Sequence, residues 1–421
     1  MEAYIYVLNF AIPFFVVLLL LEAFVAKRKD AKVIRSIDTL SSLSSGITNV
    51  IKDVLGLTVI IVSYQWVEAR IGIFEIEANW WTFVIAFIGI DFAGYWVHRI
   101  SHQVNYFWNH HIIHHSSEEF NLGCALRQTI SAWFSITVFF LLPIAILGVP
   151  PEVVAIVQPL HLFAQYWYHT RLIGKMGFLE KIIVTPSHHR VHHAINKEYL
   201  DKNLAQIFIV WDKWFGTFQE ELEDVPPVYG VKRPVRTWNP IIINFTHLWL
   251  LVRDAWYTRS WADKFKIWFK PTGWRPADVA EKFPVKIIED VYGYEKYDSQ
   301  ASKRLLYWSW FQFVVIFAMM MYMFNNIAAI GFGNALAFGS FLVFSVFSFT
   351  MLMDKHPWSL ITEFIRVTIA GMILWMQGDW FLLGTVMPGG EFVATAYFVL
   401  SLVATYYLHQ DHVGKAQPVA A

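Results

Sequence analysis

Histidines are concentrated in one part of this 421-residue sequence and are regularly spaced there. Twelve of the sixteen lie between His98 and His193. One group has the form HxxxH and two have the form HxxHH. Residues three and four apart project from the same side of a helix, so each group can direct two or three imidazole nitrogens at one place. The groups are His98 and His102; His111, His114 and His115; and His189, His192 and His193.

Eight imidazoles exceed the roughly four to six ligands that one metal ion accepts, so the groups suit two metals better than one. The single cysteine, Cys124, leaves nitrogen and oxygen as the available ligand atoms. His169, at the end of a later apolar stretch, is the natural ninth ligand. His161 is left open as a ligand, a support for a ligand or a buried polar residue. The other histidines break the spacing or are scattered, and are expected to be supporting or structural: His110, His188, His247, His356, His409 and His412.

A ligating imidazole also needs a partner on its second nitrogen, which fixes its tautomer. The candidates are Asp91, Glu118, Glu119, Asp201, Asn203 and Asp212, with a solvated surface as the competing interpretation for the two glutamates. Aromatic residues near the groups are candidates for a substrate channel or for core packing: Phe92, Tyr95, Trp96, Phe107, Trp108, Trp133 and Trp167.

The chemistry of the ligands favours iron. Zinc would bind imidazole well but has no redox role, whereas an all-nitrogen dinuclear centre in a membrane has its clearest use in activating dioxygen with iron. Haem is disfavoured, because it needs one axial histidine from each of two helices and adjacent histidine pairs would waste nitrogens.

The elements that must position these residues are membrane helices. Apolar residues make up 56% of the chain and charged residues only 16%, while the 33 basic and 33 acidic residues cancel, so nucleic acid is not an expected partner. A spanning helix needs about 20 apolar residues. The candidate stretches are 4–25, 46–66, 80–97, 130–149, 152–168, 305–325, 332–353, 358–378 and 391–408.

The basic residues at 27–32 place the end of the first stretch in the cytoplasm, and that stretch is expected to be a retained anchor rather than a signal peptide. Alternating crossings then put 98–128, 169–304 and the loop at 354–355 on the cytoplasmic side. The region after 170 is polar and contains several prolines, as expected of a cap. The predicted fold is therefore all-α, a polytopic transmembrane helical bundle with a cytoplasmic-side, histidine-rich di-iron cap.

The region 80–295 resembles the fatty acid hydroxylase and sterol desaturase superfamily of membrane di-iron enzymes, with a closer likeness to its alkylglycerol monooxygenase branch. The flanking helices match in placement alone, which implies three parts: N-terminal transmembrane helices in 1–79, a catalytic domain in 80–295 and C-terminal transmembrane helices in 296–421. The likeness is carried by Asp91-Phe92, Tyr95-Trp96, His98-Arg99, the runs 114–119, 121–122 and 125–128, His169-Thr170, the run 185–193, and the runs 201–203, 211–213 and 215–218.

The resemblance implies a di-iron centre that uses O2 to hydroxylate a lipid alkyl chain, in this branch the ether-adjacent carbon of an alkylglycerol, giving fatty aldehyde and glycerol. A sterol or fatty-acyl hydroxylase or desaturase of the same superfamily is the alternative, and a non-redox zinc protein is a third. The chain has no glycine-rich nucleotide fingerprint, so electrons come from an external donor, either a tetrahydropterin or another protein. Gln103 stands where pterin-dependent relatives usually have glutamate. The implied ligands, which are also the implied catalytic residues, are His98, His102, His111, His114, His115, His169, His189, His192 and His193.

Overall fold

The computed structural model describes residues 2–57, 63–132 and 136–413, and within these ranges the side chains of 7–411. Every regular element in the described ranges is a helix and none is a strand, as the sequence predicts. Six helices are long and apolar enough to cross a membrane. They are α1 (Glu2–Arg28), α4 (Trp80–Gln103), α15 (Lys303–Asn325), α17 (Phe332–Met353), α18 (Ser359–Gln377) and α20 (Gly390–Val413).

Three of the nine predicted spans do not form as predicted. The stretch 46–66 contains the C-terminal end of α2 (Ser36–Val54), a helix with three charged residues that packs against α15 and α17. Residues 58–62 lie outside the described residues. The stretch 130–149 breaks into α7 (Thr137–Phe140) and α8 (Leu142–Ile146), and 133–135 lie outside the described residues. The stretch 152–168 gives α9 (Pro151–Phe163), whose 13 residues reach only about 20 Å.

Apart from the 18-residue α12, the remaining helices are short, and most belong to the cap or to the lobe around α4. They are α3 (Tyr64–Ile71), α5 (Asn105–Trp108), α6 (Ile112–His115), α10 (Pro186–His192), α11 (Val210–Phe215), α12 (Pro240–Tyr257), α13 (Trp261–Lys266), α14 (Ala277–Lys282), α16 (Ile327–Ile330) and α19 (Leu383–Val386), with 3₁₀ turns η1 (Cys124–Leu126) and η2 (Gly177–Lys181).

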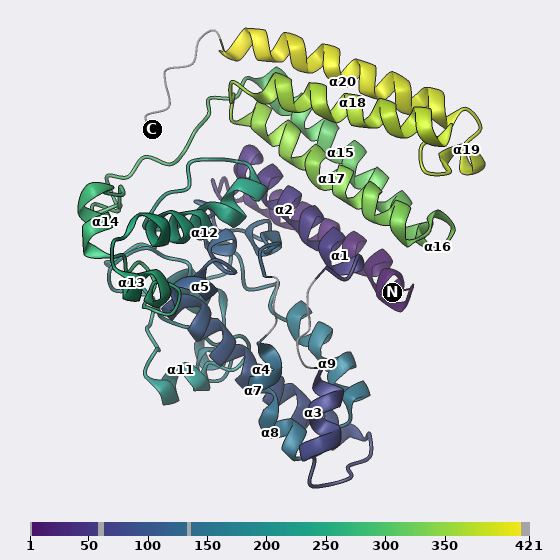
Figure 1. Cartoon of the computed structure of the whole chain (residues 1–421). Coiled ribbons are helices and arrows are strands. Elements are labelled where there is room, and N and C mark those ends of the chain that lie inside the picture. The colour runs from purple at the N-terminus through teal and green to yellow at the C-terminus, as the bar shows by residue number, and fades with distance from the viewer. Residues whose placement is uncertain (1, 58–62, 133–135, 414–421) are drawn as a thin grey trace.

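The helices α15, α17, α18 and α20 lie side by side, and α2 packs against α15 and α17 (Figure 1). Their shared core contains Ile51, Met320 and Phe338, all at most 1% exposed. Gly339 of α17 allows close approach, since a Cβ there would lie 2.6 Å from Leu55. The C-terminal helices are therefore packed onto the N-terminal ones rather than forming a separate body.

Several helix ends meet the cap on one side of the molecule. The C-terminal ends of α1 and α4 and the N-terminal end of α15 all point toward α12–α14 (Figure 1). In the loop after α17, Asp354 accepts hydrogen bonds from the Thr237 hydroxyl and from the Trp238 amide (2.8 Å). The loop after α17 therefore packs on the segment 169–304. The predicted membrane topology stays a prediction, because it counted three crossings that do not form.

Candidate metal centre

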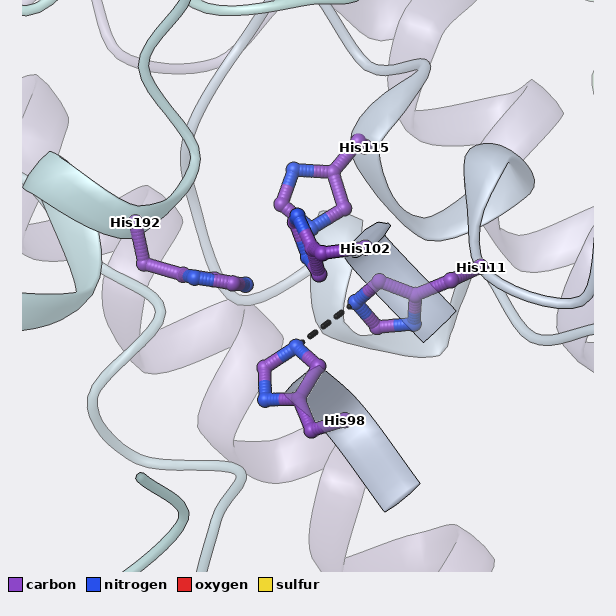
Figure 2. Close-up of side chains that lie close together, drawn as sticks. All are labelled: His98, His102, His111, His115 and His192. Atoms are coloured by element: carbon purple, nitrogen blue, oxygen red, sulfur yellow. Dashed lines mark hydrogen bonds between the residues drawn. The ribbon is translucent and has the colours of Figure 1, made fainter. Parts of the chain in front are cut away.

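The structure brings all nine predicted histidines together in two groups. In each, candidate ligand nitrogens lie within 4.8 Å of one another. Figure 2 shows the larger group, whose five rings point toward a common centre. The larger group is His98, His102, His111, His115 and His192, and the smaller is His114, His169, His189 and His193.

The two HxxHH motifs each divide between the groups in the same way. Residues four apart stay together, so His111 and His115 enter the larger group and His189 and His193 the smaller. The histidine at i+3 belongs to the other group, as His114 and His192 do. Because of the spacing i, i+3, i+4, each of the two neighbouring histidine groups contains residues from both motifs.

Local sequence explains where these rings sit. Asn79 caps the start of α4 with its side chain on the Trp81 and Thr82 amides (2.9 and 3.3 Å), and α4 runs from there to the HxxxH pair at its far end. Thr185 begins α10, Pro186 occupies its first turn, and the helix carries the third motif. Near the middle of α4, Gly94 admits the Gln206 side chain, which a Cβ would meet at 1.9 Å.

Backbone carbonyls hold several rings by their Nδ1 atoms. A carbonyl oxygen can only accept, so each such Nδ1 is the protonated donor. The pairs are His98 with Leu204 (2.7 Å), His114 with Arg127 (3.2 Å), His169 with Gln165 (3.1 Å) and His192 with Lys202 (3.1 Å). In a neutral ring, Nε2 then carries a lone pair.

The paired rings therefore present lone pairs to one another. The Nε2 atoms of His114 and His169 lie 3.3 Å apart, and neither carries a proton to share. Burial lowers the pKa of His114 to about 3, and burial followed by the neighbouring His114 lowers the pKa of His169 well below its ordinary value, so both rings are neutral. Facing lone pairs repel unless a cation lies between them.

Other contacts support the same fit. The Nε2 atoms of His98 and His111 are 2.9 Å apart, and His189 Nε2 lies 2.8 Å from that of His169. Nitrogens bound at about 2.1 Å to one ion are separated by about 3.0–3.4 Å. The spacing of 3.3 Å between His114 and His169 matches a shared metal, and the other two are slightly shorter. The Nε2 atoms of His102, His115 and His192 are buried without a partner among the described residues. The donor set fits a pair of metal ions, because metal binding requires neutral imidazoles.

The side chains that were predicted to hold the second nitrogen of a ligating histidine differ in what they contact. Asp201 meets the expectation, with its carboxylate 3.2 Å from Nδ1 of His102. Asp212 supports His98 indirectly. It accepts from the Leu204 and Ala205 amides (2.7 and 2.8 Å) and so fixes the Leu204 carbonyl, which holds His98. Asn203 bonds the His188 and Gln219 carbonyls (3.1 and 2.7 Å), not a ligand ring.

Asp91, Glu118 and Glu119 were wrong as ligand partners. Asp91 accepts from His161 (2.7 Å), from the Phe208 amide (3.0 Å) and from the Trp211 indole (2.8 Å). His161 is thus a buried polar residue bonded to Asp91 and lies in neither histidine group. Glu118 accepts from Tyr294 (2.6 Å), and Glu119 pairs with Arg171 and Lys296, so the solvated-surface interpretation fails as well.

The remaining histidines stay outside both groups. His188 accepts from the Thr185 amide (3.3 Å) at the start of α10, and His247 contacts the Asn105 carbonyl (3.0 Å). His409 lies 2.8 Å from the Ser359 hydroxyl. His110 and His356 also lie outside the groups, and the side chain of His412 lies outside the described residues.

An ion pair that sequence reasoning missed supports the second motif. Arg127 and Asp38 are each 2% exposed and lie 2.8 Å apart, and Arg127 also donates to the hydroxyls of Ser42 and Ser116. The Arg127 carbonyl in turn holds His114. The available signal was Asp38 itself, a charge within a helix that buries most of its length.

A cavity of about 910 Å³ opens onto both groups. Its lining includes His98 and His111 from one group and His114, His169 and His189 from the other, while most of the wall is apolar and comes from α1, α2 and α15. The predicted channel aromatics lie elsewhere. Phe92, Tyr95, Trp96 and Trp167 pack in a core cluster, Phe107 and Trp108 are not in the wall, and Trp133 lies outside the described residues.

The fatty acid hydroxylase family matches residues 83–217, which contain all nine histidines. Together with the long apolar helices, this match defines a membrane protein of the fatty acid hydroxylase class. Alkylglycerol monooxygenase of Homo sapiens is 36% identical over 364 residues, 85% of this chain and 80% of that protein. The Xenopus tropicalis protein is 35% identical, covering 85% and 79%, and the Danio rerio protein 37% identical, covering 64% and 60%. No solved structure matches.

The chain belongs to the alkylglycerol monooxygenase family, as the histidine motifs and their flanking residues predicted. It is an oxidoreductase and an integral membrane protein with several spanning helices.

Proposed function

We propose that the two histidine groups hold two iron ions and that the protein is a monooxygenase for the ether bond of alkylglycerols. The observation that carries the proposal is the set of facing imidazole lone pairs, above all those of His114 and His169 at 3.3 Å. Imidazole suits iron, zinc and copper alike. Membership in a monooxygenase family favours iron, because zinc cannot exchange electrons.

The iron pair, when bound, would supply the reductive activation of dioxygen. In the balanced reaction, the alkylglycerol, O2, two electrons and two protons give a hemiacetal and water. One oxygen atom enters the C–H bond beside the ether oxygen, and the other leaves as water. The hemiacetal then breaks its carbon–ether bond, its hydroxyl proton passes to the glycerol oxygen, and fatty aldehyde and glycerol are released.

The residues of the chain contribute holding and orientation. All nine rings are neutral ligands in this proposal, and Asp201 and the backbone carbonyls fix their direction. The cavity keeps the alkyl chain among apolar side chains and presents one carbon to the histidines. Such positioning is a large part of catalysis, because it replaces a random encounter by a fixed approach.

The proposed orientation places the histidine groups on the cytoplasmic side. Lys27 and Arg28 end α1, and Lys29 lies 3.5 Å from the Leu172 carbonyl in the cap. Basic residues beside a span favour the cytoplasm. An external donor then supplies the electrons there, either a tetrahydropterin or a reductase. The division at 79/80 and 295/296 stays a prediction.

Hydroxylation of a sterol or an acyl chain is the second candidate, because the same histidine motifs permit it. The products separate the two, since an ether substrate yields aldehyde whereas this alternative yields a stable hydroxylated lipid.

Product analysis tests the proposal. Iron-loaded protein is incubated with an O-alkylglycerol and O2, with and without tetrahydropterin, and fatty aldehyde, oxygen uptake and metal content are measured. We expect aldehyde in proportion to oxygen consumed and about two irons per chain. Active protein that contains zinc without iron and consumes no oxygen would refute both oxidative candidates.

A further inference from the structure

The cavity beside the histidine groups extends along α1, whose residues from Leu8 to Ala23 contribute to its wall. We call this part of the cavity the channel. Its wall on that helix includes Ile12, Phe15, Leu19 and Glu22, which share one face because they are three or four residues apart. Between Ile12 and Glu22 the helix rises by about 15 Å. Glu22 lies at the end near the histidines, since its carboxylate accepts from Thr170 (2.6 Å), the residue after His169.

One polar group in this wall is left without a partner. Tyr166 is 6% exposed and lines the cavity, and its hydroxyl is buried without a hydrogen bond among the described residues. Its ring packs on Phe15, with centroids 4.4 Å apart, and on the apolar Leu122 and Ala125. Other buried tyrosines are satisfied, as Tyr95 is by Thr217 at 3.0 Å.

A buried hydroxyl that bonds nothing costs free energy, so its retention indicates a partner that arrives from outside. Glu22 is not that partner, because its carboxylate accepts from Thr170 and from the Leu122 amide (2.8 Å) and not from the Tyr166 hydroxyl. The side chains that pack around the Tyr166 ring, such as Phe15, Leu122 and Ala125, are apolar, although the wall also carries polar side chains such as Gln165 and Asn121. A ligand that suits the channel is one long alkyl chain with an oxygen partway along its length.

We propose that this channel binds a single alkyl chain along α1 and that the Tyr166 hydroxyl donates a hydrogen bond to the ether oxygen of the bound lipid. The hydrogen bond fixes the lengthwise position of the chain and hence which carbon faces the histidines. The inference rests on the proposed function for the identity of that oxygen. Ile12, about 15 Å along α1 from Glu22, lines the channel away from the histidines and limits the chain length.

Binding without turnover tests the hydrogen bond. Metal-loaded full-length protein is titrated anaerobically with O-hexadecylglycerol and with the diol that has a methylene in place of the ether oxygen. Wild type should prefer the ether by about 5- to 10-fold, the effect of one hydrogen bond. Tyr166→Phe should lose that preference, whereas Tyr307→Phe, at an exposed position on α15, should keep it.

The same variants separate this role from a structural one. Tyr166→Phe removes an unpaired buried group, so its thermal stability should equal or exceed that of the wild type. An unchanged preference for the ether would overturn the proposal. An equal loss of affinity for both ligands would place the hydroxyl against the glycerol and would also overturn the ether contact.

Chain length tests the direction of the channel. Ile12→Trp fills the channel about 15 Å along α1 from Glu22 and should weaken binding of long chains at least 10-fold while leaving short chains unaffected. Val17→Trp adds the same ring to an exposed position on α1 and should change neither. A length-independent effect at Ile12 would contradict the orientation. Normal binding with no aldehyde in air would instead refute the proposed function and leave the channel in place.

Discussion

Two buried polar clusters in this protein differ in whether they are complete. In the C-terminal bundle, Arg366 and Glu363 are each 2% exposed and lie 2.7 Å apart. Arg366 also donates to Ser401 (2.6 Å), and Glu363 accepts from Ser348 (3.0 Å). Gln312 and Tyr397 extend the network across α15 and α20. Donors there meet acceptors.

In the histidine groups, by contrast, hydrogen-bond acceptors face other acceptors. Nδ1 of His114 and of His169 donates to a carbonyl, so their Nε2 atoms face each other with lone pairs. Both clusters are costly to bury. The first is satisfied within the protein, and the second would be satisfied by the metal ions proposed above. Completeness therefore separates a structural cluster from a binding one, even though both consist of polar residues among apolar helices.

The largest expected effect comes from removing a histidine of the incomplete cluster. His114→Ala and His192→Ala should each lower turnover below detection, because each ring belongs to one group while its motif also serves the other. Bound iron, counted per chain, should fall in parallel. Aldehyde release and metal analysis measure the two effects.

A matched control keeps the result specific. His356→Ala removes a histidine that lies outside both groups and should leave iron content and turnover unchanged. The histidine variants should still insert into membranes as folded protein. Retained turnover in either variant would exclude that residue as a ligand.

Breaking the complete cluster should affect stability and spare the chemistry. Arg366→Met leaves the Glu363 carboxylate buried and unpaired, which costs about 3–5 kcal/mol. Unfolding in detergent would report that loss, with iron content and KM unchanged. Adding Glu363→Leu removes the unpaired charge and should restore most of the stability. A loss of iron in the single variant would show that the two clusters are coupled.

The spacing of the histidines predicted the centre because ligand geometry follows helix periodicity. The pairs four apart, such as His98 and His102, need only a helix to bring them together. The groups that contact the second nitrogen of each ring come from distant parts of the chain, so helix periodicity could not predict them. Asp91 looked like a support for His98 but bonds His161, while the groups that hold the rings are largely carbonyls, as at Leu204 and Lys202, which every residue possesses.

The helices were predictable where apolar length alone decides, as in α4 and α17, and not where the chain breaks locally. Pro143 lies in the first turn of α8, where the apolar stretch 130–149 divides. The cavity wall was also beyond prediction. It joins Phe15 of α1 to Phe317 of α15, residues about 300 positions apart, and only tertiary packing brings them together.

His247, which lies outside both histidine groups, should make the stability of the protein depend on pH. Burial, together with Arg233, lowers the pKa of His247 to about 4, although its ring contacts the Asn105 carbonyl. The unfolded chain then binds the proton first, so stability falls as pH drops from about 6.5 to about 4, by roughly 3 kcal/mol in total. His247→Gln should remove this share of the acid sensitivity.

The measurement is the difference in unfolding free energy between wild type and His247→Gln at pH 7.5 and at pH 5. Subtracting the two proteins cancels the histidines of the centre, which also resist protonation. A difference that does not change with pH would mean that the pKa of His247 is the same in the folded and unfolded states.

The smallest expected effect lies at Asp201, a surface side chain that contacts one ring of the larger histidine group. Asp201 is more than half exposed and lies 3.2 Å from Nδ1 of His102. Asp201→Asn keeps an oxygen acceptor but removes the charge that strengthens the imidazole as a ligand, so iron affinity should fall about 10-fold, the low end for such partners. Competition with a chelator measures it. Asp201→Ala, which removes the acceptor as well, should fall further, and equal affinity in all three proteins would show that the backbone carbonyls alone orient the centre.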